Sequence, residues 1–241
     1  MNPMKRGPNN LLPQAVVALA VLAWSGLGFV GCTSPGIHDP ARIGPFFTPS
    51  NFVGEAQLPA ELRRVVLMPV AAGTAAPAES AAALDPVFLT ELQKENRFEV
   101  VRLTRSDCLR RFRLEELSST AVLPANFMAV VRQEYAADGV LFVDLTAYKP
   151  YRPLAIGVRA KLVLAGPDAR VLWAFDNVFS TTDDRVANAA RHHFLKTDRS
   201  DVPADFTQAV LQSPSRFGTY VAAATFATLP PVYAPSRPAQ K

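Results

Sequence analysis

The sequence predicts an α/β domain with a mixed sheet of about five strands packed against helices. Two observations predict this fold class. Strand-like apolar runs alternate with helical patterns between residues 64 and 135, and three strand patterns then follow one another directly up to residue 175. Alternation of strands and helices favours parallel pairing, whereas consecutive strands favour an antiparallel meander. The predicted order is β-α-β-α-α-β-β-β, followed by extra C-terminal helices.

The first strands and the first helix are predicted from apolar runs and a helix-start signal. Residues 65–70 (Val-Val-Leu-Met-Pro-Val) are typical of a strand covered on both faces. After a loop rich in Ala, Gly and Pro, Asp85 followed by Pro86 predicts a helix start, and Asn96 predicts its end. Residues 98–101 predict a second, short strand.

Two more helices are expected before the third strand. Thr104 with Asp107 three residues later has the spacing of a capping box and predicts a short helix that carries Cys108. No motif gives Cys108 a reactive role, so it is expected to be a small buried apolar residue. Pro124 predicts the start of the next helix, in which residues 127–135 follow helical spacing.

Three strands in succession are predicted after Gly139. Residues 140–148 are the most strand-like run of the sequence. In the next run the apolar Ile156, Val158, Ala160, Leu162 and Leu164 alternate with Arg159 and Lys161, so one face of this meander is expected to be wet. A Gly-Pro-Asp turn precedes the third run, in which Val171, Trp173 and Phe175 alternate.

The turn between the first two of these strands carries a candidate interface formed by Tyr148, Tyr151 and Arg152. Tyr and Arg are enriched among interface anchors, and loops often carry function. The alternative is that the aromatic side chains of this hairpin tip fold onto the domain.

Three helices are predicted after the meander. Asp183 or Asp184 caps the first, which runs through Phe194, and the other two cover residues 201–211 and 214–229. Small residues in the last helix, among them Gly218, suit close packing against a sheet or another helix. The Pro-rich residues 231–241 are expected to form a disordered tail.

The first 31 residues have the pattern of an export signal. Lys5 and Arg6 precede a long apolar run, and no acidic residue occurs before Asp39. The run ends in Phe29-Val30-Gly31-Cys32, and this tetrapeptide resembles the lipobox of bacterial lipoproteins, with Phe29 in the place of the usual Leu. The resemblance implies cleavage before Cys32, diacylation of its thiol and a membrane anchor through the N-terminal lipid.

An uncleaved transmembrane helix is the alternative for the leader, because the apolar run approaches the ~20 residues that a bilayer requires. Either interpretation puts the rest of the chain outside the cytoplasm. Thr33 follows Cys32 in place of the aspartate that retains enteric lipoproteins in the inner membrane. The resemblance therefore favours an anchor in the outer membrane, with the domain facing the periplasm.

The chain is thus divided into a signal peptide (1–31), a Pro- and Gly-rich tether (32–60), one α/β domain (61–230) and the tail. Phe46, Phe47 and Phe52 are too apolar for a pure spacer and are expected to contact the domain or a partner. Without the leader, 23 basic and 21 acidic residues remain. No basic cluster with interleaved aromatic residues occurs, so nucleic acid is not an expected partner.

Four short segments within residues 64–180 carry a second resemblance. They are residues 68–70 (Met-Pro-Val), 97–101 (Arg-Phe-Glu-Val-Val), 136–141 (Ala-Ala-Asp-Gly-Val-Leu) and 167–172 (Pro-Asp-Ala-Arg-Val-Leu). With their order of elements, they resemble the periplasmic domain shared by curli-secretion-channel lipoproteins and outer-membrane activators of peptidoglycan synthases. The amino-terminal domain of the Tol–Pal translocation protein has a related fold.

Acidic residues and histidines around the first helix after the meander do not predict a metal site. Asp183, Asp184, His192 and His193 are metal ligands by type. However, Asp184 and His192 are ~12 Å apart along a helix axis, and adjacent side chains diverge by about 100° around it. The expected roles are a helix N-cap and an exposed, partly packed histidine pair.

Asp144 is the other acidic residue considered for chemistry, because it lies inside the most strand-like run. By strand alternation it shares a face with Phe142 and Thr146. It could act as an acid or base only beside a second titratable group, and the sequence identifies none. It is expected to be solvated or paired with an arginine such as Arg159.

The expected function is that of a lipid-anchored, non-enzymatic accessory or assembly protein of the bacterial envelope, which binds another envelope protein and needs no cofactor. One alternative is a subunit of an oligomeric secretion pore, although the connections look short for the added strand pairs of ~10 residues that line such a pore. The other is a periplasmic hydrolase that uses the region of Asp183 and His192, or Asp144.

Overall fold

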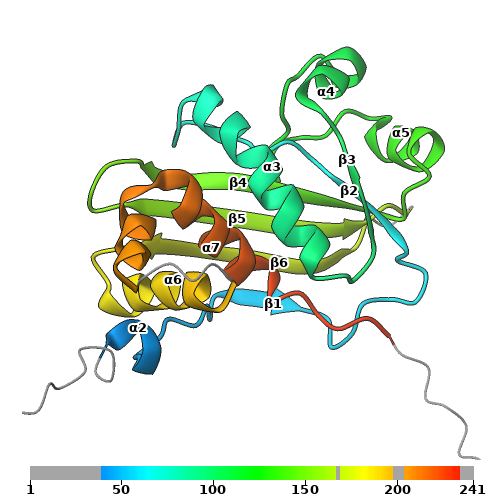
Figure 1. Ribbon diagram of the computed structural model, residues 1–241. Coiled ribbons are helices and arrows are strands. Elements are labelled where there is room, and N and C mark those ends of the chain that lie inside the picture. The colour runs from blue at the N-terminus through cyan, green and yellow to red at the C-terminus, as the bar shows by residue number, and fades with distance from the viewer. Residues whose placement is uncertain (1–38, 167–168, 198–203, 234–241) are drawn as a thin grey trace, which may run out of the picture. The chain divides into compact units, whose positions relative to one another are not determined.

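The computed structural model describes residues 39–166, 169–197 and 204–233, and its centre is a six-stranded mixed sheet in the order β1-β6-β5-β4-β2-β3 (Figure 1). The strands are β1 (Phe52–Gly54), β2 (Arg64–Leu67), β3 (Glu99–Arg102), β4 (Gly139–Lys149), β5 (Ala155–Leu164) and β6 (Val171–Ser180). The predicted α/β class with a mixed sheet is confirmed, and β1 adds one strand to the expected five.

The strand pairing follows from the connections. β2 pairs in parallel with both β3 and β4, and helical crossovers link these three strands. β4, β5 and β6 pair antiparallel through short turns, and β1 pairs antiparallel with β6. Parallel neighbours need long crossovers whereas antiparallel neighbours need only a turn. The predicted meander is therefore confirmed.

The helices form layers on both faces of the sheet. They are α2 (Pro40–Ile43), α3 (Ala78–Lys94), α4 (Arg105–Phe112), α5 (Phe127–Glu134), α6 (Asp184–Thr197), the 3-10 helix η1 (Ala204–Gln212) and α7 (Pro214–Phe226). Residues of α3, α6 and α7 bury the larger hydrophobic core against one face, in front of the sheet in Figure 1. Residues of α4 and α5 bury a second core against the other face.

Strand β2 contributes to both cores. Val65 and Leu67 belong to the larger core, whereas Val66 and Met68, the residue directly after the strand, belong to the second. All four side chains are at most 3% exposed. The continuous apolar run of this strand therefore reflects burial on both faces, as the sequence predicted.

The second layer of helices leaves part of its face open. On this side β5, β6 and β1 carry Val53, Arg159, Lys161, Ala174, Asp176 and Val178, which together we call the open sheet face. Val53 is 76% exposed and Val178 is 55% exposed. The wet face predicted for the meander is therefore present, next to the region that α4 and α5 cover.

The start of α3 differs from the prediction. The helix begins at Ala78, so Asp85 and Pro86 lie inside it rather than at its start. Asp85 is buried, and its carboxylate accepts a hydrogen bond from the Val70 amide nitrogen at 2.8 Å. Asp-Pro is a local helix-start signal. In this structure the Asp85 side chain instead makes a tertiary hydrogen bond. The burial of apolar residues such as Phe88 offsets the cost of a proline inside the helix.

The capping box predicted for α4 is confirmed. The Thr104 hydroxyl accepts from the Asp107 amide nitrogen at 3.1 Å and donates to its carboxylate at 2.6 Å. The hydrogen bond from Thr104 lowers the pKa of the Asp107 carboxyl group. The next helix begins later than predicted, at Phe127 instead of Pro124.

The C-terminal helices follow the prediction with one change of type. The Asp183 carboxylate accepts from the Arg185 amide nitrogen at 2.9 Å, which caps α6. The helix expected at residues 201–211 is the 3-10 helix η1. In α7, a Cβ added at Gly218 would lie 2.8 Å from Leu84 Cδ2 on α3. The glycine therefore permits the close helix packing that the small residues predicted.

The prediction of an extended tether over residues 32–60 is wrong from Pro40 onward. Residues 40–54, here called the strap, lie on the domain: α2 contacts α6, and β1 extends the sheet. The Phe47 ring meets Phe179 edge-on with 5.4 Å between centroids. Burial of aromatic surface and the hydrogen bonds along β6 hold this segment in place.

The N-terminal predictions and most of the predicted C-terminal tail lie outside the described residues. These include the signal peptide, the tetrapeptide Phe29-Val30-Gly31-Cys32 and residues 234–241 of the predicted tail. The prediction of a disordered tail over residues 231–241 is wrong for residues 231–233, because their backbone is hydrogen-bonded to Leu58. Over the part of the chain that the structure describes, no helix has the length and apolar composition to cross a membrane.

Candidate binding site

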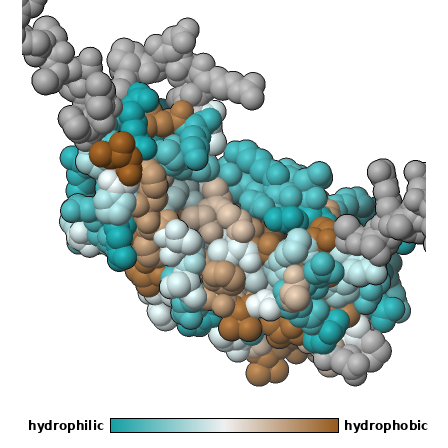
Figure 2. Space-filling model, turned by 90° about the horizontal axis from the view of Figure 1, so that it is seen from below, coloured by the Kyte–Doolittle hydropathy of each residue, from teal (hydrophilic) through white to brown (hydrophobic). Residues whose placement is uncertain are grey.

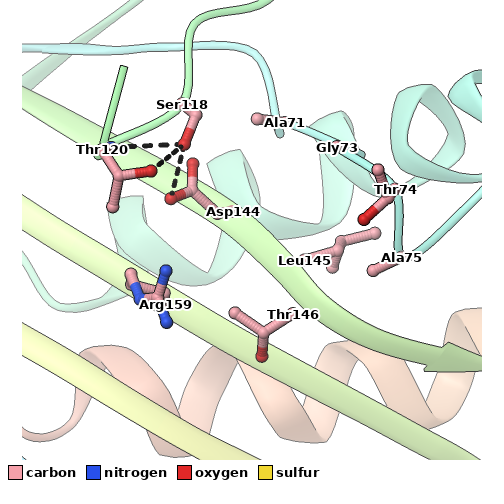
Figure 3. Close-up of a pocket in the computed structure, with 10 residues that line it drawn as sticks. All are labelled: Ala71, Gly73, Thr74, Ala75, Ser118, Thr120, Asp144, Leu145, Thr146 and Arg159. Atoms are coloured by element: carbon pink, nitrogen blue, oxygen red, sulfur yellow. Dashed lines mark hydrogen bonds between the residues drawn. The ribbon is translucent and has the colours of Figure 1, made fainter. Parts of the chain in front are cut away.

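A pocket of about 360 Å³ lies beside the carboxyl end of β2 (Figure 3). Its walls come from the loop after β2, the loop before α5, and strands β4 and β5. The lining residues are Ala71, Gly73, Thr74, Ala75, Ser118, Thr120, Asp144, Leu145, Thr146 and Arg159. In open α/β sheets, ligands commonly bind at the carboxyl ends of the parallel strands. The position and the polar lining make this pocket the candidate binding site.

Asp144 holds one wall of the pocket in place. Its carboxylate accepts from the Ser119 amide nitrogen at 2.9 Å, from the Ser119 hydroxyl at 2.5 Å and from the Ser118 hydroxyl at 3.2 Å. Asp144 is only 6% exposed. The expectation of a solvated or Arg159-paired aspartate is therefore wrong, because donors from a loop 25 residues earlier in the chain occupy its oxygens.

Arg159 and two aspartates form a polar row across three strands. In the strand register, Arg159 on β5 stands between Asp144 on β4 and Asp176 on β6. Its Nε and Nη2 atoms both contact Asp176 Oδ2 at 2.8 Å, and its side chain is 40% exposed. A second hollow of about 260 Å³ lies on the open sheet face and shares Arg159 with the first. Arg159 therefore borders both hollows.

The loop over the pocket is fixed from two strands. Lys161 Nζ on β5 donates to the Ser119 carbonyl oxygen at 2.6 Å, while Asp144 on β4 binds the serine hydroxyl groups. Neither of the two histidines in the described part of the chain lines the pocket. The hydroxyl, carboxylate and guanidinium groups that line the pocket can form hydrogen bonds with a ligand.

Thr146 lies at the edge of the pocket, where β4 is irregular. The pairing with β5 shifts between Leu145 and Ala147, and Gly157 lies opposite this bulge. A Cβ at Gly157 would lie 2.5 Å from Thr146 Oγ1 and 2.8 Å from the Ala147 nitrogen. Thr146 Oγ1 is itself buried without a hydrogen-bond partner among the residues described. The glycine therefore lets the two strands approach closely beside the site.

A partly buried ion-pair cluster positions the loop after β2. Arg105 donates to Asp85 Oδ2 at 2.9 Å, to Glu116 Oε2 at 2.6 Å and to the Val70 carbonyl oxygen at 2.7 Å. The other oxygens of the two carboxylates accept from the Val70 and Ala72 amide nitrogens, both at 2.8 Å. No sequence pattern indicates this cluster, because its three members come from three separate segments of the chain.

The acidic and histidine residues of α6 do not converge. His192 Nδ1 contacts the Ala41 carbonyl oxygen at 2.8 Å, and its ring stacks on Phe46 with 4.3 Å between centroids. His193 instead faces Tyr220, with 6.1 Å between ring centroids. Burial lowers the pKa of His193 and favours its neutral form. Within the described ranges, no group of three side chains is arranged to bind a metal ion.

Cys108 lies in the second core and is fully buried, as predicted. Burial raises the pKa of its thiol to about 11, so the protonated form predominates at neutral pH. A protonated thiol enclosed by apolar side chains acts as a packing residue.

The hairpin tip proposed as an interface is partly folded onto the domain. Tyr148 packs against the larger core, and Arg152 Nε donates to the Leu211 carbonyl oxygen at 3.2 Å. Tyr151 is 80% exposed. An interface at this tip stays a prediction, with Tyr151 as its exposed aromatic side chain.

Comparison with known proteins gives structural likeness only. No family profile matches the sequence, and no curated protein matches it. The PelC dodecamer from Paraburkholderia phytofirmans is similar at 11% identity and a TM-score of 0.37, over 71% of this chain and 95% of PelC.

Two further solved structures show comparable likeness. Lipoprotein GNA1162 from Neisseria meningitidis has 14% identity and a TM-score of 0.34, over 51% of this chain and 81% of that protein. The C-terminal domain of LpoB from Salmonella enterica has 14% identity and a TM-score of 0.32, over 48% of this chain and 82% of that domain. At these values no function is transferred from these proteins to this chain.

Proposed function

We propose that this protein is a lipid-anchored accessory protein of the bacterial envelope that binds another envelope protein and is not an enzyme. Its anchor is Cys32, at the end of the apolar leader in the lipobox-like Phe29-Val30-Gly31-Cys32. With Thr33 next to the anchor, the domain faces the periplasm from the outer membrane. The binding surface is the open sheet face with its adjoining pocket.

The observation that carries this proposal is the uneven coverage of one side of the sheet. Helices α4 and α5 bury the second core there, whereas Val53 and Val178 on the same side are more than half exposed. Arg159 borders two hollows on this side, one beside the serine loop and one on the open sheet face itself. Exposed apolar side chains beside hydrogen-bonding groups are the composition of a protein interface.

The hydrogen bonds around the two hollows support recognition. Ser118 and Ser119 donate to Asp144, and Lys161 donates to the loop backbone. Their hydrogen bonds hold the loop in one conformation, which reduces the entropy lost on binding. A rigid polar rim next to exposed aliphatic residues fits a protein partner.

The anchor is tested by the intact mass of the protein extracted from membranes. The mature chain is expected to begin at Cys32 and to carry fatty acids, whereas a Cys32→Ala variant is expected to carry none. Native material that begins at Met1 without fatty acid would contradict lipid anchoring.

The binding surface is tested with a photo-cross-linking amino acid in living cells. Val178 on the open sheet face is the test position, and Gln93, exposed on α3 at the opposite face, is the matched control. We expect an adduct with one envelope protein from Val178 and none from Gln93. Equal labelling from both positions, or none, would exclude this face. An adduct with a second copy of the chain would support the oligomeric-pore alternative.

A further inference from the structure

The strap brings the folded unit close to the anchor. Because the domain begins at Pro40, only eight residue steps separate it from Cys32. A fully extended chain spans at most about 3.3–3.6 Å per residue, so this connection reaches about 28 Å at most. The tether predicted over residues 32–60 would have had more than three times as many residues as this connection, and a correspondingly longer reach.

This reach is short compared with the folded unit. A domain of this length has a radius of gyration of about 16 Å and hence a diameter of about 40 Å. A path over its surface from one side to the other is therefore about 60 Å, roughly twice the reach of the connection. Only the side of the unit that carries α2 can contact a membrane in which Cys32 is anchored.

That side exposes apolar residues next to the point where the strap begins. Ile43 is 63% exposed and Phe46 is 36% exposed. Figure 2, viewed from the side of α2 and β1, shows hydrophobic patches among hydrophilic residues.

The strap holds these side chains in a fixed position. His192 Nδ1 forms a hydrogen bond with the Ala41 carbonyl oxygen, and the Phe47 amide nitrogen donates to the Arg185 carbonyl oxygen at 3.0 Å. One face of the Phe46 ring stacks on His192, so the ring has an inner contact and an outer exposed part. Arg42 is exposed on the same helical turn as Ile43.

We infer that Ile43 and Phe46 contact the phospholipid surface, with Arg42 at the headgroup phosphates, so that the domain sits on the membrane in one orientation. This inference rests on the proposed lipid anchor. Apolar side chains flanked by a basic residue are typical of segments that lie in the membrane interface. The opposite edge of the sheet, β3, is then about 24 Å farther from the membrane than β1, at five strand spacings of about 4.8 Å. Helix α4 lies on that far side (Figure 1).

The test uses the acylated full-length mature protein in vesicles of phosphatidylethanolamine with a minor share of phosphatidylglycerol. An Ile43→Trp variant carries an indole at the inferred contact. A Leu109→Trp variant is the matched control, because Leu109 is a 45% exposed aliphatic residue on α4. Trp173 is fully buried and contributes the same background to both variants.

We expect lipids brominated on their acyl chains to remove most of the fluorescence added by Ile43→Trp and little of that added by Leu109→Trp. If both variants float with the vesicles and neither or both are quenched, the orientation is wrong while the anchor stands. A blue shift of the Ile43→Trp emission without quenching would mean that a second copy covers this side, which also overturns the inference. Failure of the protein to float with vesicles would instead overturn the anchor, and the inference with it.

Discussion

Two clusters in this molecule place one arginine beside two carboxylates, and the two clusters have different roles. Arg105 with Asp85 and Glu116 lies between α3, α4 and the loop after β2, and the Arg105 side chain is 17% exposed. Arg159 with Asp144 and Asp176 lies across β4, β5 and β6, and the Arg159 side chain is 40% exposed.

The two clusters differ in the other groups that their side chains bind. In the Arg105 cluster, both carboxylates also accept backbone N–H groups from Val70 and Ala72, so the cluster fixes a loop. Around Arg159, the guanidinium Nε and Nη2 atoms contact one oxygen of Asp176, and Asp144 accepts its hydrogen bonds from the serine loop. The Arg105 cluster therefore stabilises a loop, because its carboxylates also bind backbone amides. The Arg159 cluster instead forms a surface suited to recognition, because its arginine is exposed to solvent.

The largest expected effect is that of Arg105→Ala. Removing one member of a buried ion pair leaves uncompensated charge, which typically costs about 3–5 kcal/mol. Because Arg105 and Glu116 are only partly buried, we expect the free energy of unfolding, measured by urea denaturation, to fall by about 3 kcal/mol, the low end of that range. Arg159→Ala is the control, and equal losses for the two variants would remove the distinction between the clusters.

The next effect is steric and concerns the site itself. In Gly157→Ala the added Cβ would meet the Ala147 backbone nitrogen at 2.8 Å, so the strands would have to separate. Overpacking of this kind typically costs about 1–3 kcal/mol. Gly166→Ala is the matched control, because no atom lies within 4 Å of a Cβ there. A loss of unfolding free energy in the control as large as in Gly157→Ala would contradict the steric explanation.

A smaller loss of about 1–2 kcal/mol is expected for Asp144→Ala, since it leaves the part-buried Ser119 amide nitrogen without its acceptor. Hydrogen exchange of residues 118–120 should accelerate, while exchange in α3 should not. Ser118→Ala removes only the 3.2 Å bond and should change the exchange less. Unchanged protection of the loop in Asp144→Ala would show that Lys161 alone holds it.

The strands and the buried faces were largely predictable because they follow from periodicity. Alternation in residues 156–164 placed Ile156 and Val158 in the core and left Arg159 and Lys161 on the wet face, as observed. The alternation failed at Val171, which is 47% exposed, because the pairing of β5 with β6 shifts between Leu162 and Val163. A bulge of one residue reverses the faces beyond it, and no local sequence signal marks it here.

The contacts of the candidate site were not predictable, because they join segments that are distant in sequence. The strand face of Asp144 followed from alternation, but its partners Ser118 and Ser119 are 25 or 26 residues away. Strand β1 was missed for a related reason. Three residues, Phe52–Gly54, give no periodicity, and their pairing depends on the free edge of β6.

Arg159→Ala is the variant expected to change stability least and binding most. Its ion pair with Asp176 is solvent-exposed, and such pairs contribute at most about 1 kcal/mol. The same side chain borders both hollows, so its removal should weaken the adduct formed from the cross-linking residue at Val178. The measurement is adduct yield at equal protein level, compared with Arg170→Ala, another exposed arginine paired with a carboxylate, Glu55. If both variants retain the full adduct yield, the ion pair of Arg159 with Asp176 makes no contribution to binding and the partner must bind elsewhere.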